Sequence, residues 1–135
     1  MRGKAFKVLN PLEDVEPEWW GKDDPRYLRC LWHTATPKTV GVKNFWFGFE
    51  IIGPGKAGMM HSHDYEELYF VLKGKALMKG EHEEHVIGPY DTVFVPPGVM
   101  HQPKNIGSED FVFVWVYAPL PGEVSEERYK KQAKP

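Results

Sequence analysis

The chain has 135 residues, with 17 Lys and Arg against 19 Asp and Glu, and a net charge of −2. This length suits one domain with one core. The even charge balance, without a long run of basic residues, argues against a nucleic-acid partner. The apolar runs are too short to cross a bilayer, so no membrane partner is expected. The single cysteine, Cys30, cannot form an internal disulfide and is typical of a reducing cytoplasm, where we expect the protein to be located.

The first 25 or so residues are interpreted as an irregular arm, because they contain three prolines and several acids. One short strand is expected there, at Lys4 to Val8. Trp19 and Trp20 should cover an apolar surface on the rest of the chain or on a second copy of it, because an arm with two bulky rings should be tied down. A small β-barrel also has an edge strand to bury, so we predict a homodimer.

From residue 26 onward, short apolar and aromatic runs alternate with turn residues. Lys43 to Ile52 alternates along its length, with the side chains of one face being Phe45, Phe47, Phe49 and Ile51. Many short strands at this spacing predict an all-β sandwich or barrel. The other predicted strands are Tyr27–Trp32, Met59–His63, Leu68–Leu72, Lys75–Met78, Glu84–Ile87, Thr92–Val95 and Phe111–Tyr117.

We expect one domain over residues 1–135, with the arm at about 1–25, the barrel at about 26–119 and a tail at about 120–135. In the tail, Ser125 could cap a helical turn or two, with acids at its start and lysines near its end. On Phe111–Tyr117 one face is aromatic and the other is valine. One of them lines the barrel, and the sequence leaves open which.

Two histidines and a carboxylate lie close together in the segment GKAGMMHSHDYEELYFVLKG. On a strand, His61 and His63 point to the same face, and Glu67, four residues later, can share it. Glu66 has the opposite parity and should point outward. A further histidine, His101, follows the rigid turn PPG and begins a new extended segment. Together the four side chains predict a site for one divalent metal ion.

The donor set contains nitrogen and oxygen and no thiolate, which disfavours a closed structural zinc site. It suits Fe, Mn, Ni, Co or Cu, or Zn with open positions. The interior of a barrel is a natural place for such a site, because inward positions of different strands converge there.

These segments resemble the two motifs of the cupin family. The first, G-x5-HxH-x3-E-x6-G, is matched from Gly55 to Gly74, and the second, G-x5-PxG-x2-H-x3-N, is matched from Pro96 to Asn105. Tyr90 stands where the second motif has its first glycine, so a locally reshaped turn is expected there. The resemblance covers roughly residues 43–118. It implies a double-stranded β-helix, the cupin or jelly-roll barrel, with its metal held by His61, His63, Glu67 and His101.

Alternation places Tyr69 on the same inward face as Glu67. Tyr69 and Tyr117 are candidate catalytic residues that could donate hydrogen bonds to a substrate, although core packing explains Tyr69 equally well. His82 and His85, in a turn crowded with glutamates, are interpreted as solvated. His33 has no partner in the sequence and is interpreted as structural or surface.

The resemblance and the metal cluster favour a metal-dependent enzyme that acts on a small molecule. The aromatic residues lean toward a planar or apolar substrate and a dioxygenase-like oxidoreductase. An isomerase, lyase or decarboxylase of a sugar or keto acid is the alternative among enzymes. It needs a proton-transfer group, and the sequence shows no clear histidine or acid for it. A non-catalytic cupin that binds a small molecule is the third possibility.

Overall fold

The computed structural model describes residues 1–120 and 133–134, so the helical turn expected near Ser125 lies outside the described residues. Strands dominate, and the helical elements within the described residues are α1 (Pro11–Asp14) and the 3-10 helix η1 (Pro25–Tyr27). Neither of them is long and apolar enough to cross a membrane. The strands are β1 (Glu18–Trp20), β2 (Arg29–Ala35), β3 (Trp46–Ile52), β4 (Met60–His61), β5 (Glu66–Lys73), β6 (Ala76–Lys79), β7 (Glu84–Ile87), β8 (Thr92–Val95), β9 (Gln102–Asn105), β10 (Phe111–Ala118) and β11 (Ala133–Lys134).

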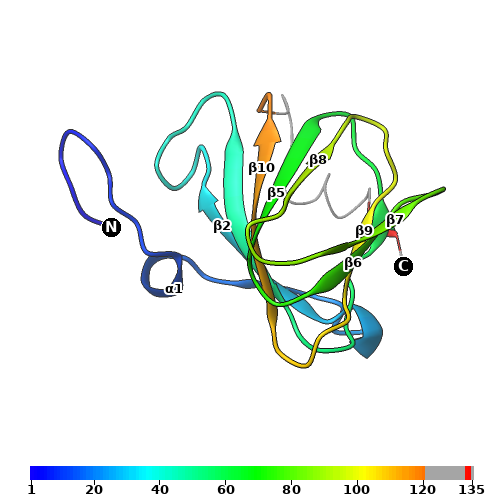
Figure 1. Cartoon of the computed structure of the whole chain (residues 1–135). Coiled ribbons are helices and arrows are strands. Elements are labelled where there is room, and N and C mark those ends of the chain that lie inside the picture. The colour runs from blue at the N-terminus through cyan, green and yellow to red at the C-terminus, as the bar shows by residue number, and fades with distance from the viewer. Residues whose placement is uncertain (121–132, 135) are drawn as a thin grey trace.

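The strands form two antiparallel sheets that enclose the core. The larger sheet has the order β1-β2-β3-β10-β5-β8, and the smaller one has the order β7-β6-β9. A short pair, β11 with β4, adds to them. In Figure 1 the small sheet, β7-β6-β9, faces the large one across the barrel. This confirms the predicted all-β jelly-roll barrel.

Alternation along β10 decides which of its faces lines the barrel. Phe111, Phe113, Trp115 and Tyr117 are buried, whereas the valines between them are only partly covered. The aromatic face is therefore the inner one. Gly48 of β3 makes room for it, because a side chain at this position would meet the ring of Trp115 at 2.4 Å.

The aromatic face predicted for residues 43–52 is the outer face of β3. There Phe49 stacks on Trp32 of β2, with ring centroids 4.5 Å apart. The inner face of β3 is formed by the residues between those predicted, and one of them is the buried Glu50. The single cysteine, Cys30, is a buried free thiol.

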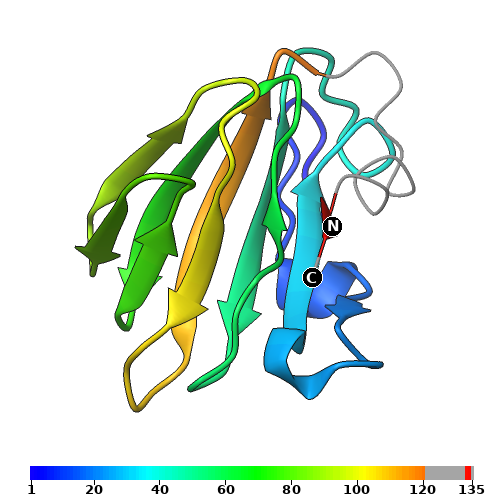
Figure 2. The ribbon, with the colours of Figure 1, turned by 90° about the vertical axis from the view of Figure 1, so that its right-hand side faces the viewer.

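The N-terminal arm differs from the prediction in two places. It forms a strand next to the barrel, where none was expected, and it lacks the strand that was expected near its start. Instead of a strand at Lys4–Val8, a single bridge joins Arg2 to Val8. β1 pairs with β2, and in Figure 2 the arm lies beside that edge of the large sheet. Trp20 is buried against the barrel as predicted, but Trp19 is 51% exposed.

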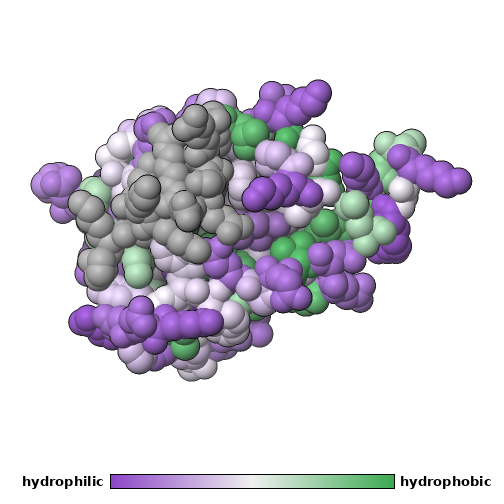
Figure 3. All heavy atoms as spheres, turned by 180° about the vertical axis from the view of Figure 1, so that it is seen from behind, coloured by the Kyte–Doolittle hydropathy of each residue, from purple (hydrophilic) through white to green (hydrophobic). Residues whose placement is uncertain are grey.

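In the view of Figure 3 the surface is mostly hydrophilic, with apolar side chains in small separate patches.

Tyr90 occupies the turn between β7 and β8 in the left-handed conformation, with φ of 72°. Glycine adopts this conformation most readily, which explains why the motif has glycine there. The turn is closed by the side chain of Asp91, which accepts a hydrogen bond of 2.8 Å from the backbone N–H of Gly88. The Tyr90 side chain is 78% exposed and therefore needs no room inside the barrel.

Candidate metal centre

Four buried side chains from three segments converge in the barrel. His61 lies on β4, His63 follows it, Glu67 lies on β5, and His101 immediately precedes β9. Each of them is at most 4% exposed, and one ligand atom from each lies within 4.8 Å of the others. Backbone hydrogen bonds of 3.1 and 2.9 Å between His61 and His101 hold β4 beside the segment that carries His101.

The turn before His101 is tied directly to the first motif. Gly98 has φ of 81°, a conformation that favours glycine. Its backbone N–H donates to the carbonyl of His63 over 2.7 Å. The turn therefore sets the distance between the two histidine-bearing segments.

The asparagine that ends the second motif has a structural role. The side-chain amide of Asn105 donates to the carbonyls of Ile52 and Glu109, each over 2.8 Å, and its oxygen accepts from Gly107 over 2.8 Å. These bonds satisfy a buried polar side chain and join the end of β9 to the end of β3.

The three histidines share one arrangement, which fixes their tautomer. Nδ1 of His61 donates to the carbonyl of Met59 over 2.7 Å, Nδ1 of His63 to Tyr65 over 3.0 Å, and Nδ1 of His101 to Val99 over 2.9 Å. A carbonyl oxygen can only accept, so each Nδ1 carries a proton. In a neutral imidazole the lone pair is then on Nε2.

These lone pairs meet the carboxylate of Glu67. Its Oε1 lies 2.9 Å from Nε2 of His63 and 3.0 Å from Nε2 of His101. Two neutral imidazole nitrogens and a carboxylate oxygen that face one another in a buried space are mutually repulsive unless a cation lies between them. The carbonyl partners of Nδ1 are the kind of contact that orients histidine ligands of metals. The cluster therefore fits a divalent metal ion.

The ionisation of the cluster also favours a cation. Burial opposes the charge on Glu67, but the adjacent His101 and His63 outweigh it and lower its pKa to about 2. Burial, followed by the nearby His101, lowers the pKa of His61 to about 3. The anionic carboxylate and the neutral His61 are the forms that bind metals. Glu66 is exposed, as its parity predicted.

Both tyrosines proposed from the sequence lie beside the cluster. The ring centroid of Tyr69 is 6.0 Å from that of His101, and the ring centroid of Tyr117 is 5.8 Å from that of His63. Both are nearly fully buried, at 3% and 2% exposure. Tyr65, which the sequence did not single out, stacks on His63 at 4.1 Å.

A second polar pair in the interior was missed by the sequence analysis. Nη1 of Arg29 donates to Oε2 of Glu50 over 2.9 Å, and both residues are 2% exposed. The guanidinium lies 5.0 Å from the ring of Trp20, in cation–π geometry. A charged residue in phase with the buried Trp46 and Ile52 was the signal that could have located Glu50.

This pair lies near the metal cluster. A side chain at Gly58, three residues before His61, would meet Nη1 of Arg29 at 3.3 Å. Burial raises the pKa of Glu50, Arg29 opposes this rise, and the charge of Glu67 adds to it. Glu50 is therefore a second interior carboxyl group that is not a member of the metal cluster and that retains its proton more readily than usual.

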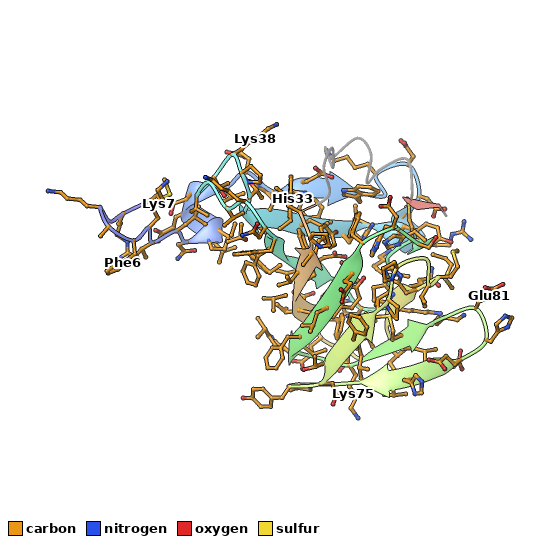
Figure 4. All side chains as sticks on the ribbon, turned by 90° about the horizontal axis from the view of Figure 1, so that it is seen from above. Phe6, Lys7, His33, Lys38, Lys75 and Glu81 are labelled. Carbon is orange, nitrogen blue, oxygen red and sulfur yellow. The ribbon has the colours of Figure 1, made fainter. Side chains whose placement is uncertain are left out.

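The remaining histidines lie outside the cluster. His33 faces inward on β2, where its Nδ1 accepts from Nε1 of Trp46 over 3.1 Å and its Nε2 lies 3.5 Å from Glu18. The Trp46 N–H requires an unprotonated Nδ1, so the neutral ring has its proton on Nε2. Figure 4 shows His33 among the strands, whereas Glu81, next to His82, projects from the hairpin tip. His82 and His85 are exposed, as predicted for a solvated turn.

Comparison with known proteins gives consistent results. The family model of the cupin domain matches residues 48–117. The chain is 34% identical over 134 residues to a glucose-6-phosphate isomerase of Pyrococcus furiosus, which covers 84% of this chain and 69% of that protein. It is also 34% identical over 105 residues to the uncharacterized protein MJ1618 of Methanocaldococcus jannaschii, covering 77% and 81% of the two chains.

A solved structure confirms the fold. The crystal structure of a predicted oxalate decarboxylase from Thermotoga maritima superimposes with a TM-score of 0.72 and 22% identity. The match covers 84% of this chain and all of the other, 100%. At this identity the likeness concerns the fold alone.

Proposed function

Because this chain belongs to the cupin family, we propose that it is a metal-dependent enzyme that acts on a small molecule. We assign the metal to His61, His63, Glu67 and His101. The observation that supports this most is the arrangement of three Nε2 atoms and one carboxylate with all Nδ1 protons directed to carbonyls. A divalent ion bound there would act as a Lewis acid toward an oxygen of the substrate.

Of the possible reactions, we favour proton transfer, as in an isomerase, lyase or decarboxylase. The sequence disfavoured this class because it showed no proton-transfer group, and the buried Glu50 supplies one. Its raised pKa brings the carboxyl group closer to the pH at which it can both give and take a proton. Arg29 holds the carboxyl group in place through their 2.9 Å hydrogen bond. Glucose-6-phosphate isomerase, the name of one relative, belongs to this reaction class.

The tyrosines have a supporting role in this proposal. Tyr69 and Tyr117 lie beside two of the histidines, and a phenol hydroxyl can donate a hydrogen bond to a substrate oxygen. Such a bond would orient the substrate and stabilise negative charge that develops on its oxygen.

A dioxygenase-like oxidoreductase is the second candidate. It is favoured by the aromatic interior, in which Tyr117 stacks on Trp115 at 4.8 Å and Tyr69 lies 5.0 Å from Phe113. A ring-lined, water-poor space suits a planar apolar substrate. This candidate gives Glu50 no catalytic task.

One experiment separates the candidates. The purified protein is analysed for metal content and then incubated in D₂O with 2-oxo acids, sugars, diketones and catechols, with and without air. The proton-transfer proposal predicts deuterium incorporation, measured by NMR, that is independent of oxygen and lost in Glu50→Gln. Conversion that consumes oxygen and survives Glu50→Gln supports the dioxygenase instead. A firmly bound metal without turnover of any compound would favour a binding protein.

A further inference from the structure

A groove lies on the side of the barrel where each sheet has a free edge. β7 ends the small sheet and β8 ends the large one, and the two are not paired with each other in the described residues. Between them is a hollow of about 620 Å³, formed by the β6–β7 hairpin, β8 and the loop 96–101. Both edges can be followed on the right of Figure 1. The volume is within the range of small-molecule pockets.

The inner end of the groove reaches one residue of the metal cluster. His101 contributes both to the lining of the groove and to the cluster. Val99, whose carbonyl accepts from Nδ1 of His101 over 2.9 Å, also lines the groove. The loop that orients one histidine is thus also a wall of the groove. A molecule lying in the groove would have its inner end next to the cluster.

The walls are apolar and the rim is charged. Met78 and Val95, on opposite walls, are 7% and 3% exposed, and Val93 packs against the core. The charged lining residues are Lys79, Glu81 and Glu83, and exposed histidines stand beside them. One lysine against two glutamates offers no net positive charge. A phosphate would gain little there, so the groove favours a molecule with an apolar body.

We propose that this groove binds the body of the substrate, and that the substrate is a mainly apolar molecule with two neighbouring oxygen atoms at its inner end and no phosphate. The inference rests on the proposed function, because it requires a metal at the cluster. A six-coordinate ion held by four side chains has two positions left, which two neighbouring oxygens can fill. The substrate would differ in this respect from the sugar phosphate in the name of the relative from Pyrococcus furiosus.

The test uses the cobalt-loaded protein and 4-nitrocatechol, a flat molecule whose visible absorption shifts when its two oxygens bind a metal. In Val99→Trp, the new ring would occupy the groove. The matched control is Val86→Trp, since Val86 is also an exposed valine, at 61% against 45%, but does not line the groove. Val93→Phe fills the groove from the opposite wall. Azide, which is small, reports access to the cobalt, and glucose 6-phosphate is added as a competitor.

We expect Val99→Trp and Val93→Phe to weaken 4-nitrocatechol binding at least tenfold and azide binding less than twofold. Val86→Trp should change neither, and glucose 6-phosphate should not displace the catechol. Unchanged catechol binding in both groove variants, with intact cobalt and azide spectra, would overturn this inference and leave the proposed function standing. So would a wild-type protein that binds azide but not the catechol, or one that prefers the sugar phosphate. A wild-type protein that binds no cobalt would overturn the proposed function and the inference with it.

Discussion

Oε1 of Glu67 lies 2.9 Å from Nε2 of His63, and the neighbouring Glu66 is exposed. Two adjacent glutamates therefore differ in one respect that matters: only one of them reaches the metal cluster. Glu67→Gln keeps the shape of the side chain and removes its charge. We expect it to weaken cobalt binding by on the order of 100-fold, because a lost ligand matters at least as much as a lost partner of a ligand.

Glu66→Gln is the matched control, and it should leave the affinity unchanged within a factor of two. Isothermal titration calorimetry of the metal-free protein measures both. Equal effects of the two substitutions would mean that the charge near the barrel, and not coordination by Glu67, governs metal binding.

The pair of Arg29 and Glu50 can be tested by a double-mutant cycle. Arg29→Met leaves a buried carboxyl group without its 2.9 Å partner. It should lower the free energy of unfolding by about 3 kcal/mol. Arg29→Met combined with Glu50→Leu removes both charges and should recover most of this loss. Urea unfolding measures these free energies. If the loss in the double variant equals the sum of the losses in the two single variants, the two residues are not coupled.

The raised pKa of Glu50 makes a prediction for the pH dependence of stability. The folded protein retains the Glu50 proton above the ordinary pKa of 4.5, so unfolding releases a proton there. Stability relative to Glu50→Gln should therefore fall as the pH rises above 4.5, by up to about 1.4 kcal/mol per pH unit until the folded pKa is reached. Urea unfolding at several pH values measures it. A difference that grows with pH would place the pKa below its ordinary value.

Tyr90 is expected to cost stability through its backbone. A non-glycine residue in the left-handed region is disfavoured by roughly 1–2 kcal/mol, and the Tyr90 side chain is largely exposed. Tyr90→Gly should therefore raise the free energy of unfolding by about 1 kcal/mol. Tyr90→Ala also loses the ring but keeps the strain, and it should be less stable than Tyr90→Gly in thermal or urea unfolding. The opposite order would mean that the left-handed backbone is not strained at this position. A loss of stability in both variants relative to the wild type would mean that the ring contact with Phe70, at 6.2 Å, outweighs the strain.

The strands and the parity of the metal-binding side chains followed from local patterns. Parity alone separated Glu67 from Glu66, because side chains alternate along a strand. The turn containing Gly98 was evident from its prolines and glycine. Parity and the turn depend on residues close together in the sequence. The meeting of His101 with His61 depends on pairing between distant segments, and it was predicted from the resemblance to the two cupin motifs.

Arg29 and Glu50 could not be paired in this way. They are 21 residues apart, and they meet only because β2 lies beside β3. The alternation of β3 predicts an aromatic face, whereas Glu50 lies on the opposite face, which is the buried one. The choice between the aromatic and valine faces of β10 likewise required the packing of both sheets, since either face is apolar enough to be buried.

Each imidazole of the cluster is oriented by a carbonyl only two residues away on its own segment. The rings therefore keep their directions without help from an ion, and exchanging one cation for another requires no rearrangement of the main chain. Such a preformed metal site has no geometric means of selecting one first-row metal over another, and the intrinsic affinities of these metals follow a common order. Which ion is found in protein purified from a cell should then mirror the metals supplied in the growth medium.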